Sequence, residues 1–475
     1  MKNNYFIKNF NKFFILFSFI GLFIYIIIRA NYLSFTHDES FSFTFLNGSN
    51  GNNTANNHLF NTYLMGICYN VFGSSEFSLR LPNVLSFILY CLGVVLLFKP
   101  HKNRGLILFL GGILFLNPFI LEFFSLARGY GISLGFMMIS LYFFLRKNTK
   151  YNYQIQFFKD FLYSLIFASF ALFANLSMIN FYISILLLFI IQYIMFNKFE
   201  FKDKRNNLIF VGVIILSLIP LYFSIERLLW LKELNQLYFG THSLFETIKS
   251  LTASSLYGII YPEWIYEGIN YFIAFSFPSI SIYFFFRRKS ISMKFIKTST
   301  LLIIMILGMF LEHALFESKY PLGRSALLYI PIYSLFIFYF LNNIFALFSQ
   351  PKRKIISIVF CSILISPLLM HSYKTFNLSS ASNWKYDMHT KSIMQIVEND
   401  LIENNTKVKM SNNWLFEPSI NYYINSKNIL LENVTKDSIS AESMYIYDFE
   451  YKYDTTKYTL LTEYEEIKTI LLKKK

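Results

Sequence analysis

Two adjacent carboxylates, Asp38 and Glu39 in SFTHDESF, are the residues of this sequence best suited to acid–base chemistry. They follow a long apolar run by about nine residues. At the mouth of an apolar bundle, two neighbouring carboxylates repel each other and lose hydration, which raises a pKa and suits proton abstraction. An ordinary hydrated pair of loop residues is the alternative. The dipeptide indicates a general base only where other polar groups converge on it.

Other polar side chains stand at the ends of later apolar runs and are candidates for the same site. Each also has a structural explanation: Arg128 can extend to the membrane interface, Arg80 can anchor the start of a span, and Glu122 can form an ion pair with Arg128. Tyr130 can pack, and an isolated Glu-His pair at 312–313 is weak evidence for a site. The candidates are His58, Arg80, Glu122, Arg128, Tyr130, His313 and Arg324.

The composition decides which kind of fold must position these groups. The chain has 475 residues, of which 55% are apolar and only 15% charged, whereas a soluble globular protein has about 25% charged residues. The net charge of +15 belongs to residues 1–371, with 30 basic against 14 acidic residues, while residues 372–475 hold 13 against 14. This pattern is typical of a polytopic membrane protein and excludes a soluble enzyme, a disordered scaffold and a nucleic-acid binder. The three cysteines have neither a disulfide-framework nor a metal-site spacing.

Long apolar runs predict about eleven transmembrane helices. Basic residues gather in alternate loops, with 22 of them in six short loops that hold three acidic residues. The positive-inside rule assigns these loops and the N-terminus to the cytoplasm, and the C-terminal segment to the other side of the cell (inner) membrane. The predicted spans are 13–29, 79–98, 105–121, 131–146, 159–176, 178–196, 207–224, 265–286, 298–316, 325–348 and 354–371.

Three of the predicted non-cytoplasmic segments are long enough to form structure of their own: residues 30–78, residues 225–264 with Trp230 and Trp264 as interface anchors, and the tail from about 372. The outer loop 30–78 contains an Asn/Gly-rich stretch at 47–57, followed by apolar residues at helical spacing that suit an amphipathic interfacial helix. The tail has short alternating runs, SMYIYDFEYKY and YTLLTEY. We therefore predict a multi-span domain, 1–371, and a small extramembrane α/β domain, 372–475.

Several segments in order carry a resemblance to a known family. After the acidic pair come Asn57-His58, then Phe72-Gly73 through Arg80-Leu81-Pro82, then SLARGYGISL (125–134) and GRSALLYIPIY (323–333). Over residues 15–340 the chain resembles the membrane-embedded GT-C glycosyltransferases, in the branch of protein O-mannosyltransferases and aminoarabinose-lipid A transferases. It departs from the pattern at Asn57-His58-Leu59, where the relatives usually have His-Pro-Pro.

The resemblance implies transfer of a hexosyl or pentosyl group from a polyprenyl-phosphate donor to a lipid, glycan or protein acceptor, with inversion. It gives Asp38 the role of general base and Glu39 that of positioning the base or the acceptor. Arg128 and Arg324 would hold the carrier phosphate, with His58, Arg80, Glu122, Tyr130 and His313 as further substrate-binding candidates. Trp384 and Trp414 either stack on sugar or are buried in the tail domain.

Two other classes of function stay open from the sequence. A transporter or flippase of lipid-linked sugars would need charges or broken helices along a midplane path, whereas the charges here gather at the outer ends of spans. A non-catalytic membrane assembly protein would work through its tail. No metal or other cofactor is predicted, a divalent metal remains an open alternative, and no nucleic-acid partner is expected.

Overall fold

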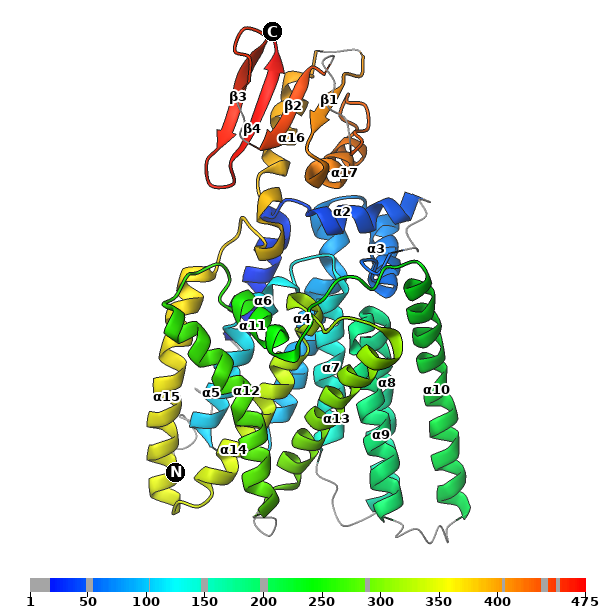
Figure 1. Ribbon diagram of the computed structural model, residues 1–475, viewed down its shortest axis with the longest axis vertical. Coiled ribbons are helices and arrows are strands. Elements are labelled where there is room, and N and C mark those ends of the chain that lie inside the picture. The colour runs from blue at the N-terminus through cyan, green and yellow to red at the C-terminus, as the bar shows by residue number, and fades with distance from the viewer. Residues whose placement is uncertain are drawn as a thin grey trace.

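Long helices run side by side and carry a small sheet domain at one end, where the C-terminus lies (Figure 1). The computed structural model describes residues 18–47, 54–101, 103–146, 153–196, 204–286, 291–403, 406–436, 443–449 and 453–475. Residues 13–17 of the first predicted span and 48–53 of the Asn/Gly-rich stretch lie outside these ranges.

Described helices overlap each of the eleven predicted spans, with 105–121 divided between α5 and α6. Six of them are long and apolar enough to cross a membrane, and a seventh span results if Ser18–Tyr32 and the bent continuation α2 are taken together. The prediction of a helical membrane protein with a C-terminal sheet domain is confirmed, and the count of eleven spans stays a prediction. The bundle helices are Ser18–Tyr32, α4 (Glu76–Phe98), α5 (Arg104–Phe115), α6 (Pro118–Glu122), α7 (Gly129–Leu145), α8 (Tyr153–Ala174), α9 (Ile179–Phe196), α10 (Lys204–Glu233), α12 (Glu263–Phe286), α13 (Met293–Phe316), α14 (Tyr329–Phe345) and α15 (Gln350–Thr375).

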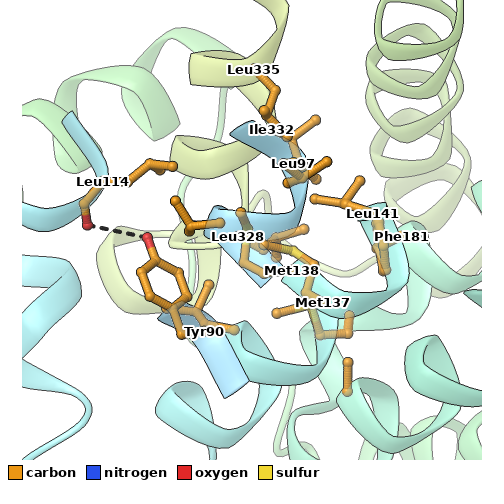
Figure 2. Packing of buried hydrophobic residues seen from close by; sticks show 14 of the residues in the cluster. Tyr90, Leu97, Leu114, Met137, Met138, Leu141, Phe181, Leu328, Ile332 and Leu335 are labelled. Atoms are coloured by element: carbon orange, nitrogen blue, oxygen red, sulfur yellow. Dashed lines mark hydrogen bonds between the residues drawn. The ribbon is translucent and has the colours of Figure 1, made fainter. Parts of the chain in front are cut away.

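The centre of the bundle is built on α4 and α7. Their side chains interdigitate with those of α9 and α14, and the Tyr90 hydroxyl donates to the Leu114 carbonyl at 3.2 Å (Figure 2). A Cβ at Gly93 would lie 2.7 Å from the backbone of Met138, so this glycine permits the close approach of the two helices. By contrast, α10 is highly apolar but only 17% of its most apolar window is buried, as expected for a helix that faces lipid.

Short elements cover the end of the bundle beneath the sheet domain. They are α2 (His37–Thr44), η1 (Phe45–Asn47), α3 (Leu59–Phe72), α11 (Leu244–Ser255) and η5 (Gly323–Ala326). The axis of α2 is bent by 70° from that of Ser18–Tyr32. The helix α3 forms where helical spacing predicted one, and it exposes Leu59, Tyr63, Ile67 and Val71 along one side.

The C-terminal domain combines a four-stranded sheet with α16 (Thr390–Asp400) and α17 (Glu417–Lys427). The strand order is β1-β2-β4-β3, with β1 and β2 parallel and the other pairs antiparallel. Its apolar core also contains Phe35 and Phe43, so the domain packs directly on α2. The strands are β1 (Met410–Asn412), β2 (Tyr445–Phe449), β3 (Tyr458–Tyr464) and β4 (Thr469–Lys474).

Candidate active site

Arg80 fixes the turn that leads from the N-terminal helix into α2. Its guanidinium is fully buried and donates to the carbonyls of Ala30, Leu33 and Ser34 at 2.8–2.9 Å, at the end of Ser18–Tyr32. Its remaining donors bind both carboxylate oxygens of Glu39 at 2.8 Å. These five hydrogen bonds use every donor of the guanidinium. The structure therefore places Arg80 in a capping and bracing position, with no donor left for a substrate.

Glu39 is committed to the same internal network. Besides Arg80, its carboxylate accepts from the Ala127 amide at 2.5 Å and from the Thr36 amide and hydroxyl at 3.0 Å. The side chain is fully buried and does not line the cavity described below. Glu39 therefore ties α2 to α4 and to the segment before Arg128, and it is not aimed at an acceptor.

Replacing Arg80 by methionine is expected to destabilise the protein by about 3–5 kcal/mol, because it leaves the Glu39 carboxylate buried and unpaired. The unfolding midpoint of the solubilised protein measures this loss. Lys391→Met is the matched control, since the pair Lys391–Glu76 is partly exposed and contributes less than about 1 kcal/mol. An unfolding midpoint of Arg80→Met equal to that of the control would contradict the bracing role.

Asp38 precedes Glu39 in α2, and its side chain points away from that of Glu39 and contacts two arginines. Its Oδ2 atom lies 3.0 Å from Arg324 Nη2 and 3.4 Å from Arg128 Nη2. Arg128 is buried and also donates to the Asp38 carbonyl and the Ser42 hydroxyl. One carboxylate from the first outer loop thus joins guanidinium groups from two distant segments of the chain.

Arg324 is held in place by aromatic rings and by an amide. Its guanidinium carbon lies 4.8 Å from the centre of the Trp384 ring and 5.6 Å from that of Phe239, within the range of a cation–π contact. Asn56 accepts from Arg128 at 2.5 Å and from Arg324 at 3.5 Å. The three charged groups and Asn56 form one connected cluster.

The charges in this cluster control the ionisation of Asp38. Burial alone raises the pKa of the Asp38 carboxyl, but the guanidinium groups of Arg324 and Arg128 outweigh burial and hold its pKa well below the usual range. The rise in pKa predicted for the adjacent carboxylates is therefore wrong for Asp38, whose carboxyl is ionised at neutral pH and can accept a proton.

A cavity of about 1420 Å³ opens above this cluster and is lined by both domains. Asp38 and Arg324 line it directly, while Arg128 lies behind them. The membrane-end wall comes from the ends of α8, α9, α10 and α13, and the opposite wall comes from the C-terminal domain through Trp414, Glu417, Pro418, Asn421 and Lys436. The volume exceeds the roughly 300–1,000 Å³ of most small-molecule sites, so the cavity has room for more than one reactant.

His58 and Tyr130 line the same cavity and contact each other edge to face, with ring centres 4.7 Å apart. Burial lowers the pKa of His58 well below its usual value, and the charges of Arg128 and Arg324 lower it further, so the ring is neutral. Its Nε2 atom is buried and has no hydrogen-bond partner within the described part of the chain. A Cβ at Gly129 would lie 2.9 Å from that of His58 and 1.9 Å from the Ala174 carbonyl, so this contact requires glycine.

Two further predicted site residues, besides Glu39, Arg80 and Arg128, do not line the cavity. Glu122 is buried at the other side of the N-terminal helix, where it accepts from Arg29 at 3.3 Å and from the Ser382 amide at 2.8 Å. The predicted alternative, an ion pair between Glu122 and Arg128, is therefore wrong, because the partner of Glu122 is Arg29. His313 is turned away from the cavity, with its Nδ1 atom 2.7 Å from the Ser318 carbonyl and its ring against Tyr320.

The sequence does not identify Asn56 as a site residue, because the composition of its Asn-rich stretch masks it. For Trp384 the sequence predicts stacking on sugar or burial, and the structure shows a buried ring in contact with Arg324. Among the residues that the structure describes, no three His, Cys, Asp or Glu side chains group as a metal site would require.

The fold is similar to that of a protein of known structure, ArnT. The chain superposes on ArnT from Cupriavidus metallidurans in a crystal structure with bound undecaprenyl phosphate, with a TM-score of 0.54, 11% sequence identity and coverage of 96% of this chain and 97% of that chain. The apo structure of the same protein gives a TM-score of 0.52 at 10% identity, with the same coverage. The sequence matches no profile of a known protein family and no curated protein. The chain therefore shares the fold of ArnT, in line with the resemblance noted in the sequence.

Proposed function

We propose that this protein transfers a sugar from a polyprenyl-phosphate donor to a lipid, glycan or protein acceptor at the non-cytoplasmic face of the cell (inner) membrane. One observation carries the proposal: the Asp38 carboxylate meets the guanidinium groups of Arg324 and Arg128 beside a large cavity between the membrane bundle and the C-terminal domain. The likeness to ArnT, which was crystallised with undecaprenyl phosphate, supports a lipid-phosphate donor.

The arrangement supplies both groups that such a transfer needs. A hydroxyl of the acceptor attacks the anomeric carbon of the donor sugar and gives its proton to Asp38. The new carbon–oxygen bond forms as the bond from the anomeric carbon to the phosphate oxygen breaks, and the polyprenyl phosphate leaves with its negative charge. Arg324, with Arg128 behind it, stabilises that charge. A single displacement of this kind inverts the anomeric centre.

The same arginines explain how Asp38 becomes a stronger base when the donor is bound. Both guanidinium groups favour the ionised carboxylate and hold the pKa of Asp38 low. A phosphate that binds Arg324 brings a second negative charge next to Asp38, which raises the pKa of that carboxyl. Donor binding therefore prepares the base for the proton that it must accept.

The C-terminal domain forms the wall on which an acceptor would rest. Trp414 is about half exposed (54%) and lines the cavity, with the edge of the His37 ring close to it. An exposed indole beside a cavity suits stacking against the apolar face of a sugar or lipid headgroup.

Replacing Trp414 by alanine is expected to raise the KM for the acceptor by about 5–10-fold, equivalent to roughly 1–1.4 kcal/mol of lost stacking. The donor affinity should stay unchanged, because Trp414 belongs to the wall opposite the membrane bundle. Initial-rate kinetics with each substrate varied in turn measure both quantities. Trp264→Ala, at an exposed indole on α12 outside the cavity, is the control, and equal acceptor KM values for the two variants would remove Trp414 from the acceptor wall.

Incubation of the purified protein with a labelled polyprenyl-phosphate sugar and a membrane lipid and glycan extract tests the function itself. Transfer releases free polyprenyl phosphate and moves the label to an acceptor with the opposite anomeric configuration. A flippase instead leaves the sugar–phosphate bond intact and moves the label across the bilayer of a proteoliposome. An intact donor in every fraction would overturn the transferase proposal.

A further inference from the structure

The first turn of α2 is held by a carboxylate from the C-terminal domain. Thr36 is the N-cap of this eight-residue helix, so the first helical amide is that of His37, which has no acceptor within the helix. The His37 amide donates to Asp387 Oδ2 at 2.7 Å, across a separation of 350 residues. Asp387 ends the short helix η6 (Ser382–Asp387), which carries Trp384.

Asp387 is itself fixed by its own domain. It is buried, and its other oxygen accepts from the Ser419 hydroxyl at 2.9 Å and from the Thr390 hydroxyl at 3.4 Å. One carboxyl oxygen therefore contacts α2 while the other is attached to α17 and α16. The position of the α2 N-terminus follows the position of the C-terminal domain.

Further contacts of the C-terminal domain surround the same turn. His37 Nδ1 lies 2.8 Å from the Leu415 carbonyl, and the Phe35 amide donates to the Tyr423 hydroxyl at 2.8 Å. On the following side, Glu39 is held by Arg80 of the membrane bundle. Asp38 thus stands between one neighbour fixed by the C-terminal domain and another fixed by α4.

From this geometry we propose that Asp387 is a positioning residue for Asp38 and acts through the His37 amide. The inference rests on the proposed function and adds that the C-terminal domain orients the base in addition to covering the cavity. An eight-residue helix is too short to hold its own geometry. A displacement of about 1 Å at a reacting group costs on the order of 100-fold in rate.

The contact depends on an acceptor oxygen more than on a charge. Burial raises the pKa of Asp387 to about 8, so the carboxyl is largely neutral at pH 7. An asparagine at 387 keeps one carbonyl oxygen for the His37 amide, and its amino group can donate to the hydroxyls of Ser419 and Thr390. Asparagine at position 387 should therefore keep the contact with the His37 amide, whereas alanine should lose it.

The first test compares Asp387→Ala, Asp387→Asn and Asp400→Ala. Asp400 binds Lys473 and Tyr445 within the same domain and lies away from α2, so it controls for general damage to the sheet. We expect Asp387→Ala to lower kcat by about 10–100-fold with donor affinity within about threefold of wild type. Asp387→Asn should keep most of the turnover, and Asp400→Ala should keep kcat. Equal losses in the alanine and asparagine variants, or wild-type kcat in Asp387→Ala, would overturn the proposal.

A second comparison, between His37→Pro and His37→Ala, leaves Asp387 intact and removes the donor of the same hydrogen bond in the proline variant alone. Proline is accepted at the first helical position and lacks the amide hydrogen, and Thr36 has the extended backbone (φ −76°, ψ 162°) that a residue before proline needs. Both His37→Ala and His37→Pro lose the imidazole, but only proline loses the amide. We expect kcat of His37→Pro to be at least 10-fold below that of His37→Ala, and equal values would refute the role of the hydrogen bond.

Hydrogen exchange separates this inference from the proposed function. Amides of residues 35–44 should exchange faster in Asp387→Ala than in wild type, Asp387→Asn or Asp400→Ala, whether or not any transfer is detected. Faster exchange without transfer activity in the wild-type protein would reject the transferase proposal and keep the contact. Unchanged exchange in Asp387→Ala would reject the positioning role even in an active enzyme.

Discussion

Asp38→Asn is expected to lower kcat for sugar transfer by about 10²–10⁴-fold, the usual contribution of a general base. Asparagine has nearly the shape of aspartate but cannot accept the acceptor's proton. The variant should still fold, because the bracing of α2 depends on Glu39 and Arg80, and because the asparagine carbonyl oxygen can still accept a hydrogen bond from Arg324 or Arg128. The affinity for the donor should be equal or higher, because the carboxylate of Asp38 no longer competes with the donor phosphate for the two arginines. Kinetics and a donor-binding titration give the two quantities.

The control for this substitution is Asp454→Asn, the same chemical change at an exposed turn of the C-terminal domain. It should leave both kcat and donor affinity at wild-type values. If Asp38→Asn also turns over at the wild-type rate, Asp38 is not the base. The remaining carboxylates that line the cavity, Glu312 and Glu417, would then be tested in turn as glutamine variants.

Arg324→Ala is expected to weaken donor binding by about 30-fold, which corresponds to about 2 kcal/mol for a charge-assisted contact. Arg324 is the more informative of the two arginines, because its side chain lines the cavity whereas Arg128 is buried behind it and supports the local structure. Isothermal titration with a polyprenyl phosphate measures the loss. Arg353→Ala, on α15, is the control for removing one positive charge, and an unchanged Kd in Arg324→Ala would contradict the phosphate-binding role.

The same substitution should change the pH profile in a defined direction. Arg324 favours the ionised form of Asp38 and lowers its pKa, so its removal raises that pKa. The base must be deprotonated to act, and the acidic limb of kcat/KM should therefore move to higher pH in Arg324→Ala. A limb that stays in place would show that a group other than Asp38 controls it.

The sequence was sufficient for the class of fold and for the main residues of the candidate site. Apolar runs mark membrane helices because each helix must satisfy its backbone internally and present apolar side chains to lipid, and both requirements act within one segment. The motif segments around Asp38, Arg128 and Arg324 could also be identified from the sequence, since each lies next to the end of an apolar run. Whether these segments meet is not a local property, and the structure shows that they do.

The different roles of Asp38 and Glu39 were decided by tertiary structure alone. Adjacent residues on a helix point in different directions, so one carboxylate reaches the cavity and the other reaches Arg80, which lies 41 residues away. The sequence pattern could not indicate which of the two would be buried. Asp387 is a stronger case, because its partner lies 350 residues away and the intervening chain crosses the whole bundle. Hydropathy and motif spacing describe neighbours along the chain, whereas these contacts depend on how the C-terminal domain packs on α2, which only the folded chain determines.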